Sequence, residues 1–158
     1  MTTEKILSKS PGETTVFGKR LAKYLKGGDI VCLLGDLGSG KTTLIKGIAQ
    51  GLKVDQKKVN SPTFVLLNIY EGRLTLFHFD LYRLENVEDI RSIEYDEFLY
   101  GNGVSVIEWA DRMGALLPKE YLQIELTHRS PEERLIRLTA KGRRYNHMIG
   151  HITPAHCA

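Results

Sequence analysis

The sequence contains few of the cysteines that disulfide bonds and many structural zinc sites require. Its 158 residues include only two cysteines, Cys32 and Cys157, which excludes a disulfide framework and a cysteine-ligated zinc site. Apolar runs are short: Ile30–Leu34 is typical of the longest, whereas a membrane span needs roughly 18 to 20 such residues. The first residues, MTTEKILSKSPGE, lack the apolar segment of a signal peptide. We therefore expect a cytoplasmic protein that does not enter a membrane.

Neither sign of charge dominates, because 22 Lys and Arg stand against 19 Asp and Glu. The distribution is uneven. Residues 1–60 hold 11 basic and 5 acidic groups, residues 71–111 hold 3 and 10, and residues 112–158 hold 8 and 4. A nucleic-acid binder usually shows one dominant basic face. The uneven distribution allows a basic surface patch but does not predict one. We expect the acidic stretch 87–99 and the basic end after Arg129 to serve as surfaces for protein partners.

No repeat, low-complexity tract or linker divides the chain, and 42% of its residues are hydrophobic. This predicts one domain over residues 1–146. The last residues, 147–158, hold three of the five histidines and show no periodicity that we recognise. We expect them to form a poorly ordered tail, so that truncation after Asn146 has little effect.

Several segments carry clear patterns of secondary structure. Ser10-Pro11-Gly12-Glu13 is a capping box that opens a helix, which we expect to run to about Lys26, before Gly27-Gly28. The remaining expected elements are strands at 30–34, 64–70, 74–80, 104–108, 122–126 and 135–139, and helices at 41–51 and 87–99. Strands 64–70 and 74–80 should form an antiparallel hairpin. The alternation of a buried strand, a glycine-rich loop and a helix predicts an α/β domain.

The glycine-rich loop carries the strongest chemical signal. Gly35-Asp36-Leu37-Gly38-Ser39-Gly40-Lys41-Thr42 matches the phosphate-binding pattern G-x-x-x-x-G-K-[ST], after a buried strand and before a helix. Glycines let backbone N–H groups turn toward phosphate oxygens, and the helix N-terminus favours negative charge. Lys41 would reach the β and γ phosphates and Thr42 would offer its hydroxyl to Mg²⁺. The expected nucleotide-binding set is Gly35, Asp36, Leu37, Gly38, Ser39, Gly40, Lys41, Thr42, Thr43 and Trp109.

A magnesium nucleotide also needs a carboxylate at the end of a second strand. Glu108 ends the apolar strand 104–108, and Asp80 ends the strand 74–80. Glu108 is our first choice as the metal-binding acid. The two acids could divide the work, one near the metal and one orienting the attacking water. We expect His78 to be packed or exposed rather than catalytic.

Two further features lie close to these acids in the sequence. Ser61-Pro62-Thr63 precedes a strand, where a hydroxyl could sense the γ-phosphate or simply form a turn. Trp109, the only tryptophan, follows Glu108 directly. It belongs either to the core or beside the nucleotide.

Missing motifs narrow the choice of nucleotide and reaction. No guanine-specific N-K-x-D sequence and no LSGGQ-like signature occur, which favours ATP and argues against a Ras-like GTPase or an ABC ATPase. Two alternatives stay open. One is a small-molecule kinase, although no arginine-bearing lid is evident. The other is a binding module that holds the nucleotide and seldom hydrolyses it.

Four motifs together resemble the TsaE (YjeE) family of small bacterial P-loop ATPases. They are GDLGSGKTTL at 35–44, SPTF at 61–64, HFDLYRL at 78–84 and IEWADR at 107–112. The resemblance extends from about Ser10 to Gly142. Ala110 departs from it, because family members more often have proline after the EW pair. The resemblance implies a single P-loop NTPase domain with a mixed central β-sheet and flanking helices.

The resemblance also implies a function and residue roles. It implies an ATPase that binds ATP or ADP with Mg²⁺ and supports synthesis of threonylcarbamoyladenosine next to the anticodon of tRNA, with TsaD and TsaB as partners and tRNA contacted through the complex. Thr42 and Glu108 would hold the magnesium, Lys41 the phosphates, and Asp80 and Thr63 would act near the γ-phosphate. Pro11 and Glu132 would lie near the adenine.

Comparable hydrolases gain a rate factor of roughly 10³ to 10⁵ from an arginine finger. No such arginine is identifiable in the sequence. We therefore expect slow hydrolysis by the protein alone and faster hydrolysis with its partners.

Overall fold

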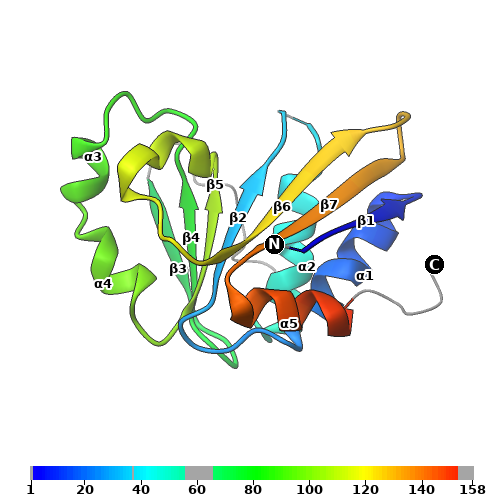
Figure 1. Cartoon of the computed structure of the whole chain (residues 1–158), viewed down its shortest axis with the longest axis horizontal. Coiled ribbons are helices and arrows are strands. Elements are labelled where there is room, and N and C mark those ends of the chain that lie inside the picture. Colours follow the sequence, from blue (N-terminus) through cyan, green and yellow to red (C-terminus); the bar gives the residue numbers. More distant parts are fainter. Residues whose placement is uncertain (1, 37, 56–65, 153–158) are drawn as a thin grey trace.

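The structure, a computed structural model, describes residues 2–36, 38–55 and 66–152. Within these ranges the strands form one seven-stranded sheet in the order β1-β7-β6-β2-β5-β4-β3 (Figure 1). The expected mixed α/β fold is therefore confirmed. The strands are β1 (Thr3–Ser8), β2 (Ile30–Leu34), β3 (Leu67–Tyr70), β4 (Leu76–Asp80), β5 (Val104–Glu108), β6 (Tyr121–His128) and β7 (Arg134–Lys141).

The sheet has a parallel centre and antiparallel margins. Strands β6, β2, β5 and β4 are parallel, whereas β3 pairs with β4, and β7 with both β6 and β1, in antiparallel fashion. Because parallel strands end at the same edge, the loops that follow β2, β4 and β5 gather at one end of the sheet. This places the residues after those strands within reach of one another.

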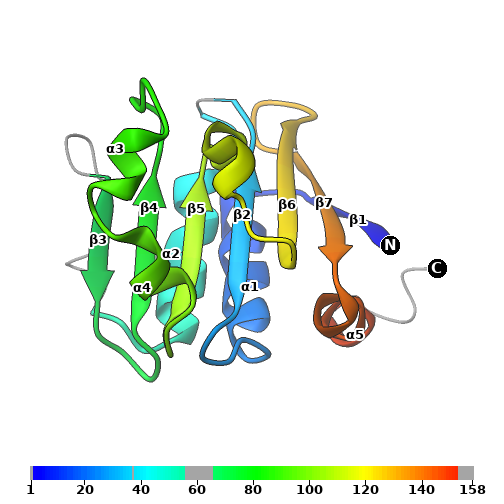
Figure 2. The same ribbon diagram turned by 60° about the vertical axis from the view of Figure 1, so that its left-hand side comes forward.

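Helices α1 (Pro11–Ala22) and α2 (Lys41–Gly51) cover one face of the sheet (Figure 2). Their apolar sides join Val31, Leu33 and Val106 in the larger core cluster. The two helices touch closely, since a Cβ at Gly18 would lie 2.7 Å from the carbonyl oxygen of Leu44. Ser10 Oγ accepts the N–H of Glu13, as the capping pattern predicts. Helix α1 ends at Ala22, four residues before the predicted Lys26.

The opposite face carries three short helices, α3 (Glu88–Arg91), α4 (Tyr95–Leu99) and the 3₁₀ helix η2 (Ala110–Leu116). They cover the second core cluster, which includes Cys32, Phe79 and Ile107. The predicted continuous helix over 87–99 is wrong. Glu94 adopts φ of +53° between α3 and α4, a left-handed conformation that ends the helical hydrogen bonding.

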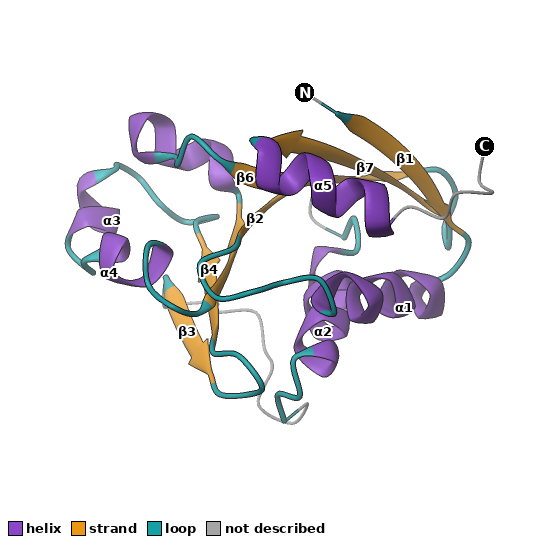
Figure 3. Ribbon diagram, turned by 60° about the horizontal axis from the view of Figure 1, so that its bottom comes forward, coloured by secondary structure: helices purple, strands orange, loops and turns teal. Residues whose placement is uncertain are grey.

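The end of the chain departs most from the sequence-based expectation. Residues Arg143–Ile152 form helix α5, which lies alongside β7 (Figure 3). The prediction of a poorly ordered tail is therefore wrong for residues 147–152, while residues 153–158 lie outside the described ranges. Tyr145, Met148, Ile149 and Ile152 are all buried. They occupy positions i, i+3, i+4 and i+7, which is the spacing of a helical apolar face, a signal that the intervening histidines obscured.

Strand β1 also went unpredicted. It pairs only with β7 at the edge of the sheet and most of its side chains are exposed, so its sequence shows little apolar alternation. Among the described helices, none is long and apolar enough to span a membrane.

Candidate functional site

The glycine-rich loop connects β2 to α2 at the carboxyl end of the parallel strands. Gly38 and Gly40 adopt φ of +78° and +103°, in the left-handed region that favours glycine. Helix α2 begins at Lys41, and Gly40 supplies no side-chain cap, so the positive end of the helix dipole at this loop favours an anion. Leu37 lies outside the described residues. The rest of the loop has the backbone arrangement that the phosphate-binding pattern predicts.

Lys41 lies inside this end of the molecule, with only 5% of its surface exposed. Its Nζ donates to the carbonyl oxygen of Gly35 at 2.5 Å and lies 3.8 Å from the centre of the Trp109 ring. Burial lowers the pKa of Lys41, and the charges of Glu108 and Asp80 oppose that shift. The ammonium group is thus held by one backbone carbonyl and one aromatic ring, beside two carboxylates.

The two predicted acids lie side by side. Asp80 of β4 pairs in register with Glu108 of β5, so both side chains point to the same face of the sheet, the face that α2 covers. Glu108 is buried, and its carboxylate accepts a hydrogen bond from His78 Nε2 at 2.7 Å. Asp80 is more open, and its Oδ1 accepts the N–H of Tyr82 at 3.0 Å. Burial raises the pKa of Asp80, and the neighbouring Glu108 adds to the increase.

His78 holds a place that sequence reasoning did not assign. It is packed as expected, with 1% of its surface exposed, but it also fixes the position of Glu108. The two residues occupy neighbouring strands two positions apart in register, because His78 pairs with Val106. The alternation of β4 would have placed His78 on the side of Asp80, but only strand pairing shows that it meets Glu108.

Trp109 adopts a left-handed backbone conformation, with φ of 59° and ψ of 42°, which costs a non-glycine residue about 1 kcal/mol or more. This turn directs its ring back over Lys41. The ring also meets Tyr82 at 5.2 Å between centroids, and the Arg112 guanidinium lies 5.6 Å from it. Trp109 therefore lies at the glycine-rich loop and also packs against the second core cluster, and its position beside a nucleotide stays a prediction.

A further contact was missing from the sequence-based set. Arg134, the first residue of β7, reaches the outer side of the loop and donates to the carbonyl oxygens of Gly38 and Ser39. A lone arginine at a strand start carries no recognisable pattern, so no sequence signal could have found it. A cavity of about 460 Å³ borders the same loop and is lined by Gly35, Ser39 and Trp109, among others.

The remaining predicted residues are placed as follows. Thr42 and Thr43 follow Lys41 in the first turn of α2 and are half-buried. Pro11 opens α1, and Glu132 lies in the loop between β6 and β7; both are exposed. Thr63, with the rest of Ser61–Thr63, lies outside the described residues. The structure thus brings together the loop, Lys41, Asp80, Glu108 and Trp109.

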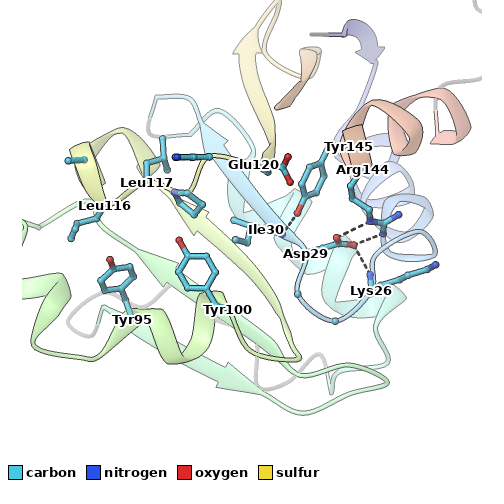
Figure 4. A pocket seen from close by; sticks show the side chains of 15 residues that line it. Lys26, Asp29, Ile30, Tyr95, Tyr100, Leu116, Leu117, Glu120, Arg144 and Tyr145 are labelled. Carbon is cyan, nitrogen blue, oxygen red and sulfur yellow. Dashed lines mark hydrogen bonds and ion pairs between the residues drawn. The ribbon is translucent and has the colours of Figure 1, made fainter. Parts of the chain in front are cut away.

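A larger cavity than this one lies elsewhere in the described part of the chain. It measures about 790 Å³ and is found at the opposite end of the sheet, where Asp29, Tyr95, Tyr100 and Arg144 are among its lining residues (Figure 4). Size alone would favour a site there, but the glycine-rich loop and the paired acids lie at the other end. We therefore assign the candidate site to the glycine-rich loop.

Known proteins are similar to this chain in sequence and in fold. A family model described as "Threonylcarbamoyl adenosine biosynthesis protein TsaE" matches residues 8–136. The tRNA threonylcarbamoyladenosine biosynthesis protein TsaE of Bacillus subtilis is 43% identical over 137 residues, which cover 86% of this chain and 85% of that protein. Its counterpart in Treponema pallidum is 43% identical over 122 residues, covering 77% and 90%.

A solved structure agrees with these relatives. The crystal structure of Bacillus subtilis YdiB superimposes with a TM-score of 0.80 and 36% identity, covering 96% of this chain and 94% of the other. The family match includes the glycine-rich loop, Asp80, Glu108 and Arg134. The chain belongs to the TsaE family.

Proposed function

We propose that this protein binds ATP with Mg²⁺ at the glycine-rich loop, hydrolyses it, and thereby supports the synthesis of threonylcarbamoyladenosine in tRNA. One observation carries the proposal: Lys41 stands at the start of α2 beside two carboxylates, Asp80 and Glu108, that end neighbouring strands in register. The names of the relatives support the part that concerns tRNA.

The residues present fit a magnesium ion. Mg²⁺ prefers hard oxygen ligands, usually one or two protein groups together with substrate phosphates and water. Thr42 and Glu108 would supply such oxygens, and His78 would keep the Glu108 carboxylate in place. No group of three or more acidic, histidine or cysteine side chains suited to a metal occurs among the described residues. The ion, when bound, would neutralise charge on the β and γ phosphates.

The other side chains would act on the nucleotide and on water. Lys41 would leave the carbonyl of Gly35 and the Trp109 ring to contact the phosphates, which exchanges neutral partners for anionic ones. Asp80, with a raised pKa and a more open position, would orient the attacking water. We further propose that the protein works in the cytoplasm with TsaD and TsaB, and that these partners accelerate hydrolysis.

A phosphate-release assay tests the reaction. We expect slow release from Mg-ATP by the protein alone, faster release when TsaD and TsaB are added, and loss of release in Glu108→Gln, which keeps an acceptor for His78. Glu97→Gln, an exposed acid on α4, is the matched control and should behave as wild type. Transfer of labelled γ-phosphate to a small acceptor would instead identify a kinase. ATP binding without release, in a variant that still supports tRNA modification, would identify a binding module.

The Trp109 ring offers a direct test of binding. Since the Lys41 ammonium lies against it, moving that group to the phosphates should change the fluorescence of this only tryptophan. We expect a saturable change with Mg-ATP and none with Mg-GTP at the same concentration. Equal responses to both nucleotides would contradict the assignment of ATP.

A further inference from the structure

One guanidinium connects two loops that are far apart in the sequence. The Nε of Arg134 donates to the carbonyl oxygen of Ser39 at 2.9 Å, and its Nη2 donates to that of Gly38 at 3.3 Å. Its Nη1 lies within 3.2 Å of three carbonyl oxygens in the loop between β6 and β7, those of Ser130, Pro131 and Glu133. Arg134 thus connects the glycine-rich loop to a segment some 95 residues away.

The segment on the far side is itself well held. The N–H of Arg129 donates to the carbonyl of Glu133 at 3.0 Å, and the N–H of Glu133 donates to Ser130 Oγ at 3.2 Å. The β6–β7 hairpin continues directly from this turn, with His128 paired to Arg134. The guanidinium therefore rests on a rigid support, and it transmits that rigidity to Gly38 and Ser39.

The contact with Arg134 restricts a glycine-rich loop that would otherwise be free to change its conformation. Gly38 and Gly40 give the backbone its required conformation, but glycine also has the greatest freedom to lose when a loop becomes ordered. A loop whose N–H groups face the phosphates directs some of its carbonyls outward, and these need donors from elsewhere. Arg134 supplies the donors for two of them before any nucleotide arrives. The cost of ordering the loop is then met in folding rather than in binding.

The charge of Arg134 adds to this effect. Within the described residues Arg134 has no carboxylate partner, whereas Arg137 on the same strand pairs with Glu125 at 3.5 Å. Its positive charge therefore lies uncompensated behind the loop, where it favours an anion. Lysine could not replace it, because an ammonium group lacks the planar fork that reaches acceptors on two sides.

We infer that Arg134 is a positioning residue, which holds the glycine-rich loop in its phosphate-binding conformation by bridging it to the β6–β7 loop. The inference rests on the proposed nucleotide site. We expect Arg134 to affect the affinity for ATP and for ADP alike. Its contacts are with Gly38 and Ser39, in a loop that would bind phosphates present in both nucleotides.

The test compares Arg134→Ala and Arg134→Lys with Arg137→Ala, an exposed arginine of the same strand that does not contact the loop. The first measurement is hydrogen exchange of the amides of residues 38–42 without nucleotide. We expect faster exchange there in both Arg134 variants and wild-type exchange in Arg137→Ala. The second is calorimetric affinity for Mg-ADP, which should weaken by about tenfold in both Arg134 variants.

Chemical rescue separates positioning from a general loss of structure. Millimolar guanidinium should restore part of the affinity of Arg134→Ala, and should leave the affinities of wild type and Arg137→Ala unchanged. The inference would be overturned by wild-type exchange at residues 38–42 in Arg134→Ala. Wild-type affinity for Mg-ADP in Arg134→Lys would overturn it as well. If wild type bound no nucleotide, the proposed function would fail, while the exchange comparison would still decide whether Arg134 holds the loop.

Discussion

The charged groups at the two ends of the β-sheet lie in opposite surroundings. At the carboxyl end of the parallel strands, Lys41 and Asp80 are removed from water and lie near the buried Glu108, and Ser39 Oγ and His78 Nδ1 lack hydrogen-bond partners among the described residues, as does Ser105 Oγ near the amino end of β5. At the amino end, the Asp29 carboxylate accepts hydrogen bonds from Arg144 Nε at 3.1 Å, from Arg144 Nη2 at 2.6 Å and from the N–H of Lys26 at 2.7 Å (Figure 4). The N–H of Ile30 there donates to the Tyr145 hydroxyl.

The pKa shifts show the same contrast. Burial lowers the pKa of Lys41 and raises that of Asp80, so both groups are held where their charged forms are disfavoured. The hydrogen bond to Asp29 instead raises the pKa of Arg144 and favours its charge. The charged forms of Lys41 and Asp80 are thus disfavoured at one end of the sheet, whereas the Asp29–Arg144 pair contributes stability at the other. Substitutions at the two ends should therefore separate function from folding.

The largest effect should come from removing the part of α5 that supports the amino end. Truncation after Asn146 deletes three buried side chains, those of Met148, Ile149 and Ile152. At about 1.5 to 3 kcal/mol for each, the loss approaches the whole stability of a domain of this size. We expect urea denaturation, followed by circular dichroism, to show a largely unfolded protein. His147→Ala, an exposed position on the same helix, is the control. An unchanged midpoint after truncation would show that α5 contributes nothing.

Lys41→Met tests the other end. It removes a buried charge of lowered pKa and keeps the apolar stem, so hydrolysis of ATP should fall by about 100-fold or more. Because the folded pKa lies below the unfolded one, the ammonium opposes folding at neutral pH, and this penalty fades as pH rises toward the unfolded value. The nucleotide-free variant should therefore melt no lower than wild type at pH 7. A clear drop in its melting temperature would break the contrast between the ends.

Asp29→Ala should lower stability without touching the nucleotide site. It removes the acceptor for Arg144 and for the N–H of Lys26. Since the Arg144 side chain is 37% exposed and water replaces part of the loss, we expect a cost of about 2 kcal/mol in the free energy of unfolding. Glu88→Ala, which breaks the exposed pair with Arg91, should cost less than about 0.5 kcal/mol. Nucleotide affinity should stay unchanged in both variants. A lower nucleotide affinity in Asp29→Ala alone would show that the two ends of the sheet are energetically coupled.

The smallest effect concerns Asp80→Asn. The raised pKa means that folded protein binds the Asp80 proton more tightly than unfolded protein does, so the ionised carboxylate lowers stability at neutral pH. Asparagine keeps an acceptor for the N–H of Tyr82. We expect a gain of less than about 1 kcal/mol at pH 7. It should shrink as pH falls through the raised pKa toward the ordinary value of about 3.9. A thermal melt series across pH measures it, and a gain that grows on acidification would contradict the sign.

The elements that depend on residues close together in the sequence could be predicted. The strand 30–34, the helix 41–51 and the strand 104–108 match β2, α2 and β5 residue for residue, because each is a strongly patterned segment bounded by glycine, proline or polar residues. The antiparallel pairing of β3 with β4 was also predicted. Helix α5 was within reach of the same reasoning, since its apolar spacing is helical, but its histidines suggested disorder.

The mixed α/β class, the glycine-rich loop and the two strand-end acids are thus properties that the sequence determined by itself, through short-range periodicity and the chemistry of glycine, lysine and carboxylates. Only the tertiary structure decided which groups meet. Register between β4 and β5 brings His78 to Glu108, and the β6–β7 hairpin brings Arg134 to a loop that lies far away in sequence. Such contacts leave no local pattern, because strand pairing and the packing of distant segments determine them and neighbouring residues do not.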